Sequence, residues 1–487
     1  MPSLFRSISN GSGFPLQELQ TLPFEGWKKA LCSAVEAGAH LSSLSLLPNQ
    51  KLLAVLSDSP NHRVLVGVTE VGKSYPSLVP DCPQTQLFER EIFEQYGIEP
   101  IGHPWLKPVR SPLEMANADQ FYKVEGEEVH EVAVGPVHAG VIEPGHFRFQ
   151  CHGETVLHLE IALGYQHRGI EEALKHGPDL RTPHYMETLA GDSSIAHATA
   201  YSRLIESMKQ AEIPPRAEAI RAIAAELERL ANHVGDLGAL SGDVGFLPTM
   251  SYCGRLRGDL LNLTALLCGN RFGRGLVRPS GVRFNLSSDK IQTIKTRLNA
   301  VETDVHSAIK LLFNTPSVLA RFEDTGIVSA STAKQIGMVG PAARASGMEY
   351  DVRRHLGYGV YNDLQIQLPR ETRGDCLARA QVRSHEIAES FRIIQQLLDE
   401  LPEGAISIDL PNQLEPNLIG VALVEGWRGE ICHVASTDAQ GRFSHYKVID
   451  PSFHNWFGLA LALRNEEISD FPLCNKSFNL SYCGHDL

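Results

Sequence analysis

Four long segments with the periodicity of amphipathic helices decide most of what this chain of 487 residues can fold into. The clearest begins at Pro214-Pro215, and one face of it is marked by Ile220, Ile223, Leu227, Leu230, Val234 and Leu237. The other three segments span Tyr252–Leu267, Ser288–Phe313 and Gly374–Leu401. Such faces become buried by packing against one another or against a sheet, so the pattern predicts a large, mainly helical domain.

The first part of the chain has a mixed pattern. A helix over Phe24–Ala39 is followed by two short strands, Leu52–Leu56 and Arg63–Val68, and by a helix over Gln86–Tyr96 that stops at Gly97. This order predicts a small α+β module over residues 1–110. Prolines then punctuate a polar stretch, and we expect an interdomain linker over residues 111–128 that separates two independently packed modules.

Strand patterns open and close the second part, which spans residues 129–487. Phe147–Gln150 and Thr155–Ile161 precede the helices, and a hairpin over Ile419–Ser436 comes before a helix over Phe453–Arg464. The predicted fold class is α+β: a small N-terminal module followed by a large, mainly helical domain with a β cap.

Charge and cysteine usage exclude several kinds of partner and site. The formal net charge of −13 argues against a nucleic-acid partner, which needs a basic face. The nine cysteines include no C-x-x-C pair, so they predict neither a disulfide framework nor a closed zinc site. No window of about 20 apolar residues exists, and the first residues lack the pattern of a signal peptide. If the protein works at a membrane, other chains must hold it there.

Several motifs, in a fixed order, resemble two subunits of respiratory complex I. Leu87–Ile98 followed by Gly102-His103-Pro104 is similar to the signature of the small peripheral-arm subunit. Gly135–His138, Gly164–Glu171 and Arg344–Gly347 resemble blocks of the quinone-site subunit.

The same two-part fusion is found in the large subunits of formate hydrogenlyase and hydrogenase-4-type nickel–iron hydrogenases. Glu425–Glu430 and Pro451–Trp456 match that branch. The resemblance implies a nickel–iron hydrogenase large-subunit-like fold for the second part of the chain.

Nickel–iron hydrogenases hold their metals with four thiolates from two C-x-x-C pairs, because thiolates are soft, anionic donors that bridge two metals. By the resemblance, the first pair falls on Ala190 and Ser193 and the second on Ser481 and Gly484. None of these positions has a cysteine, and Cys483 lies out of register. We therefore expect no metal at this site, no nickel–iron centre and no hydrogenase activity.

The quinone site of complex I also lacks these thiolates and binds the quinone headgroup through a histidine and a tyrosine. By the resemblance, these two donors fall on Ile142 and Gly191, so both are missing and the chain departs from both parent types. A quinone stays the candidate electron carrier. We expect no cofactor bound by this chain itself and an iron–sulfur cluster in a partner subunit.

Polar residues remain around the expected cavity, which is formed by the 135–146 loop, the 190–197 segment and the C-terminal tail. Glu143 stands where the hydrogenase branch has a proton-relaying glutamate, and the near-neutral pKa of histidine suits His197 to the same task. These two are the candidate catalytic residues. The alternatives are a backbone-capping carboxylate for Glu143 and a hydrogen-bonded core histidine for His197. The other candidates for the cavity lining are His138, Asp192, Ser193, Ser481 and His485.

Three expectations concern local contacts. Asp192 is predicted to cap the N–H groups of the helix that follows it. Arg344 and Arg353 are candidates for an anion clamp or, alternatively, for ties between core elements. The space vacated by cysteines at the four positions is expected to hold water, a ligand or an inward-turned side chain such as Tyr482 or His485.

The resemblance implies a peripheral subunit of a membrane-bound, complex I-like oxidoreductase of the NADH- or ferredoxin:quinone type. The implied partners are an iron–sulfur small subunit of complex I type, a ferredoxin-like subunit and antiporter-like membrane subunits, which hold the chain at the cytoplasmic side of the inner (cell) membrane. Its implied task is to shape the cavity beside the partner's cluster and to pass electrons to a quinone or another carrier, coupled to ion pumping. The alternative is a structural or coupling subunit without redox chemistry of its own.

Overall fold

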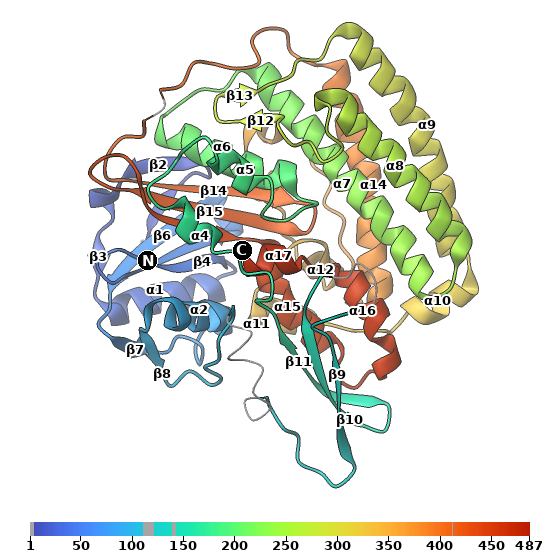
Figure 1. Ribbon diagram of the computed structural model, residues 1–487, viewed down its shortest axis with the longest axis horizontal. Helices are drawn as coiled ribbons and strands as arrows, with labels where there is room; N and C mark the ends of the chain where they lie inside the picture. Colours follow the sequence, from blue (N-terminus) through green and yellow to red (C-terminus); the bar gives the residue numbers. More distant parts are fainter. Residues whose placement is uncertain (1–3, 111–120, 139–142, 412) are drawn as a thin grey trace.

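A mixed sheet and two helices form most of the first part of the chain, drawn in blue in Figure 1. The computed structural model describes residues 4–110, 121–138, 143–411 and 413–487. The strand order is β1-β6-β5-β4, with β3 parallel to β6. The strands are β1 (Arg6–Ile8), β3 (Thr21–Leu22), β4 (His40–Leu47), β5 (Lys51–Asp58) and β6 (Arg63–Glu70).

The two helices of this part follow from their sequence patterns. Helix α1 (Phe24–Glu36) buries Trp27 and Leu31 on one face. Helix α2 (Gln86–Tyr96) ends where Gly97 takes a left-handed φ of 67°, a conformation that favours glycine. Both helices therefore lie where they are predicted.

Strand β2 (Ser12–Pro15) leaves the first part and joins the sheet of the last part, the cap sheet, in the order β16-β15-β14-β2. The other strands of this sheet are β14 (Leu418–Gly426), β15 (Gly429–Thr437) and β16 (Phe443–Ile449). Gly13 pairs with Gly420, and a Cβ on Gly13 would lie 2.8 Å from the backbone of Met208. Glycine is needed there because the two backbones approach so closely.

One apolar core runs through both parts. It contains Trp27 and Leu53 of the first part together with Leu227, Ile394 and Val421 of the second. The expectation of two independently packed modules is therefore wrong. The division into residues 1–110, a linker 111–128 and residues 129–487 stays a prediction, and most of that linker (111–120) lies outside the described residues.

Long helices pack side by side in the second part, shown in green, yellow and orange in Figure 1. Helix α7 contacts α8 and α14, and α9 packs on α8. The apolar stripe predicted on α7 is buried, with each of its six side chains at most 1% exposed. These helices are α7 (Pro215–Asp243), α8 (Leu247–Cys268), α9 (Ser288–Phe313) and α14 (Cys376–Asp399).

A sheet in the order β11-β10-β9 projects from the lower side of the molecule in Figure 1, and β11 packs against α15. These elements are β9 (Val129–Val134), β10 (His146–His152), β11 (Thr155–Ala162) and α15 (Pro451–Ala462). The predicted fold class, α+β with a small first part, a mainly helical second part and a β cap, is confirmed. Within the described ranges, we find no helix that combines the length and apolar character needed to cross a bilayer.

The remaining elements are shorter or connect these layers. They are β7 (Ser74–Pro76), β8 (Glu99–Ile101), α4 (Ile170–Leu174), α5 (Thr182–Met186), α6 (Ser194–Met208), β12 (Val277–Arg278), β13 (Gly281–Val282), α10 (Pro316–Phe322), α11 (Ala330–Ile336), α12 (Gly340–Ala345), α13 (Val352–His355), α16 (Phe471–Phe478) and α17 (Tyr482–Asp486).

Candidate functional site

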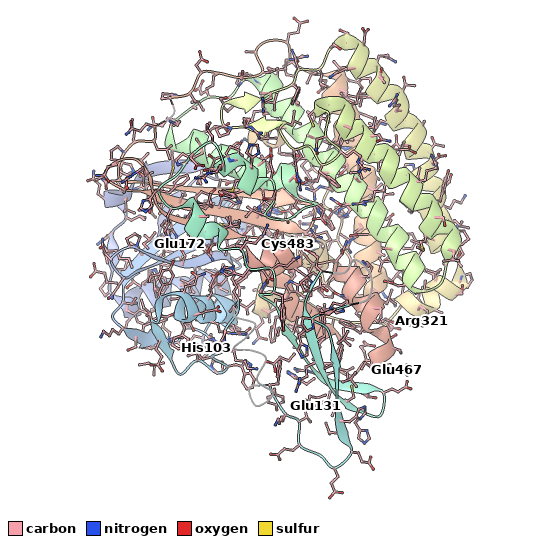
Figure 2. All side chains as sticks on the ribbon, in the orientation of Figure 1. His103, Glu131, Glu172, Arg321, Glu467 and Cys483 are labelled. Carbon is pink, nitrogen blue, oxygen red and sulfur yellow. The ribbon has the colours of Figure 1, made fainter. Side chains whose placement is uncertain are left out.

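The three segments expected to form the site meet around the C-terminal helix α17. Cys483, near the centre of the view in Figure 2, interacts through its thiol with the Glu143 carboxylate and with the Gly191 backbone. Arg168 donates hydrogen bonds to the carbonyls of Leu189 and Cys483, each at 3.1 Å. Residues more than three hundred positions apart in the sequence therefore share one site.

The four positions at which the resemblance places metal ligands are buried, but they do not form a thiolate site. Ala190, Ser193 and Ser481 are 0%, 3% and 2% exposed. The Ser481 hydroxyl accepts a hydrogen bond from the Gly484 N–H at 2.9 Å and so caps α17. A Cβ on Gly484 would lie only 2.7 Å from Cγ of Asp450. These residues do not fit a nickel–iron centre, because they offer no thiolate and a carboxylate fills the space at Gly484.

The side chain that fills this space is not one of those expected. Tyr482 instead packs its ring on Trp456, with ring centroids 4.8 Å apart, and His485 stacks on Phe453 at 5.3 Å. Asp450 precedes Pro451 and caps α15 by accepting a hydrogen bond from Ser452 N–H at 2.8 Å. The capping of α15 explains why an aspartate stands at position 450. Nothing in the sequence predicted its second contact, with Gly484.

Asp450 begins a chain of hydrogen bonds through four buried side chains. Its Oδ2 lies 3.0 Å from Nε2 of His197, whose Nδ1 lies 3.2 Å from Nε2 of His433. Nδ1 of His433 lies 2.9 Å from the hydroxyl of Tyr446. His197 comes from α6, His433 from β15 and Tyr446 from β16. Sequence reasoning found His197 but missed the other three, because no local motif connects them.

Two arrangements of protons satisfy this chain, and they run in opposite directions. With both imidazoles neutral, the Tyr446 hydroxyl donates to His433, His433 donates to His197, and His197 donates to Asp450. With His197 protonated, it donates to both Asp450 and His433, and His433 donates to the Tyr446 oxygen. A proton can therefore be taken up at one end and released at the other by shifts along existing hydrogen bonds.

The surrounding residues set the protonation state of the side chains in this hydrogen-bonded chain. Burial raises the pKa of Asp450, but the hydrogen bond and charge of His197 and the charge of Arg428 outweigh it, so the pKa is below its ordinary value. Burial, with the charge of His197, holds the pKa of His433 well below its usual range. Burial raises the pKa of Tyr446 well above its usual range. Asp450 is thus ionised, and His433 and Tyr446 are neutral.

Tyr446 lines a cavity of ≈ 390 Å³ between α2, α4 and β16. Lys447 lies in it, 2.6 Å from Glu91 and 3.0 Å from Glu171. Burial raises the pKa of Glu171, but the charges of Lys447 and Arg110 bring it below its ordinary value. Tyr446, the last residue of the hydrogen-bonded chain, is thus among the residues that line a cavity with charged groups.

The predicted relay residue Glu143 is half-buried beside Cys483. Burial first, and then the charge of Glu143, raises the pKa of the Cys483 thiol to about 11. The thiol therefore keeps its proton at neutral pH and does not act as an anionic ligand.

Other predicted residues have structural partners. Nε2 of His138 lies 3.0 Å from the Gly145 carbonyl, which ties the loop together. Asp192 forms a two-point ion pair with Arg428 at 2.6 and 2.8 Å. It does not cap α6, so that expectation is wrong. Glu228 of α7 does so, by accepting from the N–H groups of Ile195 at 2.8 Å and Ala196 at 3.2 Å.

Arg344 and Arg353 pair with carboxylates of the chain itself. Arg344 contacts Glu386 at 2.6 Å and Glu425 at 2.9 Å, and Arg353 contacts Asp351 at 2.7 Å. All five side chains are at most 1% exposed. These contacts favour ties between core elements over an anion clamp.

Of the two positions at which quinone donors were expected, Ile142 lies outside the described residues. Gly191 is exposed, and a Cβ there would meet no described atom within 4 Å. A separate, mostly apolar cavity of ≈ 370 Å³ reaches His485. Its lining also includes Leu87, Trp105, Leu159 and Trp456. Its volume is in the range of small-molecule sites.

Comparison with known proteins links both parts of the chain to one type of enzyme complex. Residues 243–418 match the family described as the respiratory-chain NADH dehydrogenase 49 Kd subunit, and residues 30–118 match the corresponding 30 Kd subunit.

Three curated proteins illustrate the range of relatives. Formate hydrogenlyase subunit 5 of Escherichia coli is 28% identical over 84% of this chain and 76% of its own length. The carbon monoxide-induced hydrogenase of Rhodospirillum rubrum is 30% identical over 72% of this chain and 97% of its own. NADH-quinone oxidoreductase subunit 4 of Thermus thermophilus is 30% identical over 70% of this chain and 90% of its own.

Proposed function

The chain belongs to the family of the respiratory-chain NADH dehydrogenase 49 Kd subunit and its hydrogenase relatives, and we propose that it functions without nickel–iron chemistry. A part similar to the 30 Kd subunit is fused ahead of the 49 Kd-type part. The chain is a peripheral subunit of a membrane-bound, complex I-like oxidoreductase. The observation that carries this proposal is the Asp450 carboxylate, which fills the space that a side chain on Gly484 would need.

The proposed partners are an iron–sulfur subunit of complex I type, a ferredoxin-like subunit and antiporter-like membrane subunits, with the chain on the cytoplasmic side of the membrane. Relatives named as a hydrogenase and as a subunit of NADH-quinone oxidoreductase support this type of assembly. The proposed task is electron transfer from the partner's cluster to a quinone or another carrier, coupled to ion pumping.

In this proposal, the residues of the chain supply protons to the reaction. Reduction of a quinone to a quinol consumes electrons and protons in equal number, so the site needs a proton path as well as an electron donor. The hydrogen bonds from Tyr446 through His433 and His197 to Asp450 offer such a path. Glu143 beside Cys483 is the second candidate relay. The apolar cavity at His485 is the candidate place for the carrier.

The first test concerns the metal. The complex, purified with all its subunits, is expected to contain no stoichiometric nickel and to evolve no hydrogen from a reduced viologen dye, because the four ligand positions offer no thiolate. Elemental analysis and gas chromatography measure the two quantities. About one nickel per chain together with hydrogen evolution would refute the proposal.

The second test concerns the proton path. In His197→Gln the amide cannot pass a proton between its two polar atoms, so quinone reduction by the complex is expected to fall about a hundredfold. The matched control is His233→Gln, since His233 is equally buried and bonds Glu386 at 2.8 Å outside the path. Equal rates in both variants and in the wild type would exclude this role for His197.

A structural or coupling subunit is the second candidate, and Gly191, which has no side-chain donor where the resemblance places one for a quinone, favours it. On that alternative, no quinone is reduced at this chain. His197→Gln would then change complex assembly, measured by native gel electrophoresis, and would leave the turnover of assembled complex unchanged.

A further inference from the structure

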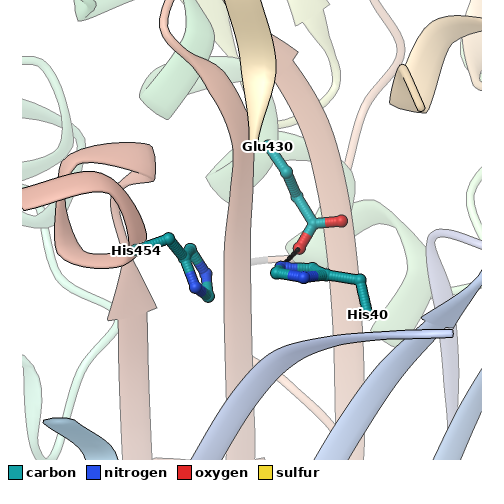
Figure 3. Close-up of side chains that lie close together, drawn as sticks. All are labelled: His40, Glu430 and His454. Atoms are coloured by element: carbon teal, nitrogen blue, oxygen red, sulfur yellow. Dashed lines mark ion pairs between the residues drawn. The ribbon is translucent and has the colours of Figure 1, made fainter. Parts of the chain in front are cut away.

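Three side chains from distant parts of the sequence face one another beneath the cap sheet (Figure 3). They are His40 at the start of β4, Glu430 in β15 and His454 in α15. Nε2 of His40 lies 3.8 Å from Oε1 of Glu430, and the two imidazole rings have centroids 4.7 Å apart. One ligand atom from each residue can be chosen so that all three lie within 4.8 Å of one another.

The three polar atoms that meet here have no hydrogen-bond partner in the part of the chain that the structure describes. Nε2 of His40, Oε1 of Glu430 and Nε2 of His454 are each buried and unpaired there. The side chains of His40 and Glu430 are 12% and 0% exposed, and His454 is 7% exposed. Buried polar groups in proteins nearly always have partners, because an unpaired one costs about 1–3 kcal/mol. Three such atoms together point to a group that satisfies all of them.

The chemistry of the three side chains selects the kind of group. Each histidine has a buried, unpaired Nε2 in this cluster, and a neutral imidazole nitrogen has a lone pair that it can donate to a metal ion. Two neutral imidazoles and a carboxylate form a common donor set for divalent transition metals such as zinc.

The neighbouring residues hold these side chains in place. The second oxygen of Glu430 accepts a hydrogen bond from the Tyr350 hydroxyl, Oε1 lies 3.8 Å from Nε2 of His40, and the Ser42 and Ser57 hydroxyls lie beside the same carboxyl group. The His454 ring packs edge-on against Phe88, with centroids 5.8 Å apart. Such supporting contacts are typical of residues that ligate metals.

The distances between the three donor atoms fit a single metal ion after a small movement of the side chains toward one another. Donor atoms on a tetrahedral zinc ion, with bonds of about 2.1 Å, lie about 3.4 Å from one another. The 3.8 Å between His40 and Glu430 needs to shorten by a few tenths of an ångström, and no separation in the group needs to shorten by more than about 1.4 Å. Rotations of the side chains supply movements of this size, without a change in the backbone.

We propose that His40, Glu430 and His454 bind one divalent transition-metal ion, which ties β4 of the first part to β15 and α15 of the second. The proposal is independent of the function proposed above, since none of the three residues belongs to the hydrogen-bonded chain. The three protein ligands leave a fourth position on the ion for water. Unlike the nickel–iron centre, the site needs no cysteine.

The test uses the full-length protein, in its complex or alone, loaded with zinc chloride and dialysed against metal-free buffer. About one zinc ion per chain is expected by elemental analysis, with a lower melting temperature after treatment with a chelator. His454→Gln and Glu430→Gln are expected to retain less than a tenth of this zinc. His233→Gln is the control and is expected to retain all of it, since its partner is also a buried glutamate but the described residues supply no third ligand there.

X-ray absorption of the zinc-loaded wild type gives a test that does not depend on the folding of variants. Nitrogen and oxygen neighbours at about 2.0–2.2 Å with the scattering pattern of imidazole are expected, and no sulfur at about 2.3 Å. Zinc that binds through sulfur, zinc retained equally in all three variants, or no zinc retained by the wild type would each overturn the proposal. In the last case, a bridging water satisfies the three side chains instead.

Discussion

At the scale of the single residue, Gly484 and Asp450 decide what the site can hold. The absence of a side chain at 484 lets the Asp450 carboxylate enter, and the carboxylate in turn orients His197 through a 3.0 Å hydrogen bond. The same carboxylate caps α15. One buried carboxylate thus links the end of the chain, helix α6 and helix α15, so a small change at position 484 has consequences for all three.

Gly484→Ala is expected to destabilise the protein by about 1–3 kcal/mol, because the added methyl group would lie 2.7 Å from Asp450 in a closed interior. The matched control is Gly191→Ala in the same site, where a Cβ meets no described atom within 4 Å. Thermal unfolding of the two variants measures the difference. Equal melting temperatures would mean that Asp450 does not occupy this space.

At the scale of the element, the N-terminus of α6 shows a contact that links two helices. Its first free N–H groups are satisfied by Glu228, which is carried by α7 and lies more than thirty residues away in the sequence. Burial raises the pKa of Glu228 to about 8, although the two backbone N–H groups act in the opposite direction. The cap is therefore largely protonated at neutral pH.

The raised pKa of Glu228 predicts that the free energy of unfolding falls as the pH rises. An unfolded glutamate titrates near pKa 4.3, and the folded one at about 8, so the folded state holds a proton that the unfolded state has lost. This stabilisation is complete below about pH 4.3 and is lost as the pH rises through 8. In Glu228→Gln, the melting temperature is expected to fall less between pH 5 and 8.5 than in the wild type.

The control for this prediction is Glu403→Gln, at an exposed position. Its pH dependence is expected to follow that of the wild type. A Glu228→Gln curve that runs parallel to the wild-type curve would show that Glu228 does not hold its proton in the folded state.

The long helices and several strands, such as β5, β6 and the β14–β15 hairpin, were the elements that sequence could predict. The stripe from Ile220 to Leu237 defines α7 because its period is local, and Gly97 ends α2 for the same reason. Strand β4 was missed, since its serines Ser42, Ser43 and Ser45 are buried and no alternation of polar and apolar residues remains. Strand β2 was missed because its partner β14 lies about four hundred residues away.

The sequence also predicted only part of the site. The resemblance placed Glu143, His197 and the tail together, and these segments do meet. It could not find Asp450, His433 or Tyr446, because their connection exists only through packing of α6 against β15 and the strand order of the sheet. The capping of α6 was assigned to the nearest acidic residue, whereas the fold supplies Glu228.

At the scale of the whole molecule, the two parts depend on each other. Strand β2 completes the cap sheet, and the core contains residues of both parts. The unpaired edge of β14 would be open in a protein without its first strands, and such edges promote aggregation. We therefore expect each part to be less stable without the other.

Residues 1–110 produced alone are expected not to fold stably, because they lose the β14 partner of β2 and the cover of the buried strand β4. Circular dichroism during heating measures this, with the full-length protein as reference, which is expected to show a cooperative transition. A cooperative transition in the fragment, with a melting temperature within a few degrees of the full-length protein, would support the predicted domain boundary instead.

The fit of Asp450 against Gly484 also restricts how such a chain can change over generations. A thiolate at position 484 first requires the loss of the Asp450 carboxylate, and that loss leaves the buried N–H of His197 without a hydrogen-bond acceptor. Either substitution alone is therefore harmful, although the two together with three further cysteines restore the donors of a metal centre. Selection that acts on one mutation at a time therefore removes the single substitutions between the carboxylate and the thiolate arrangement. A protein with Asp450 in this space has no path of stable single-mutation intermediates to a thiolate site.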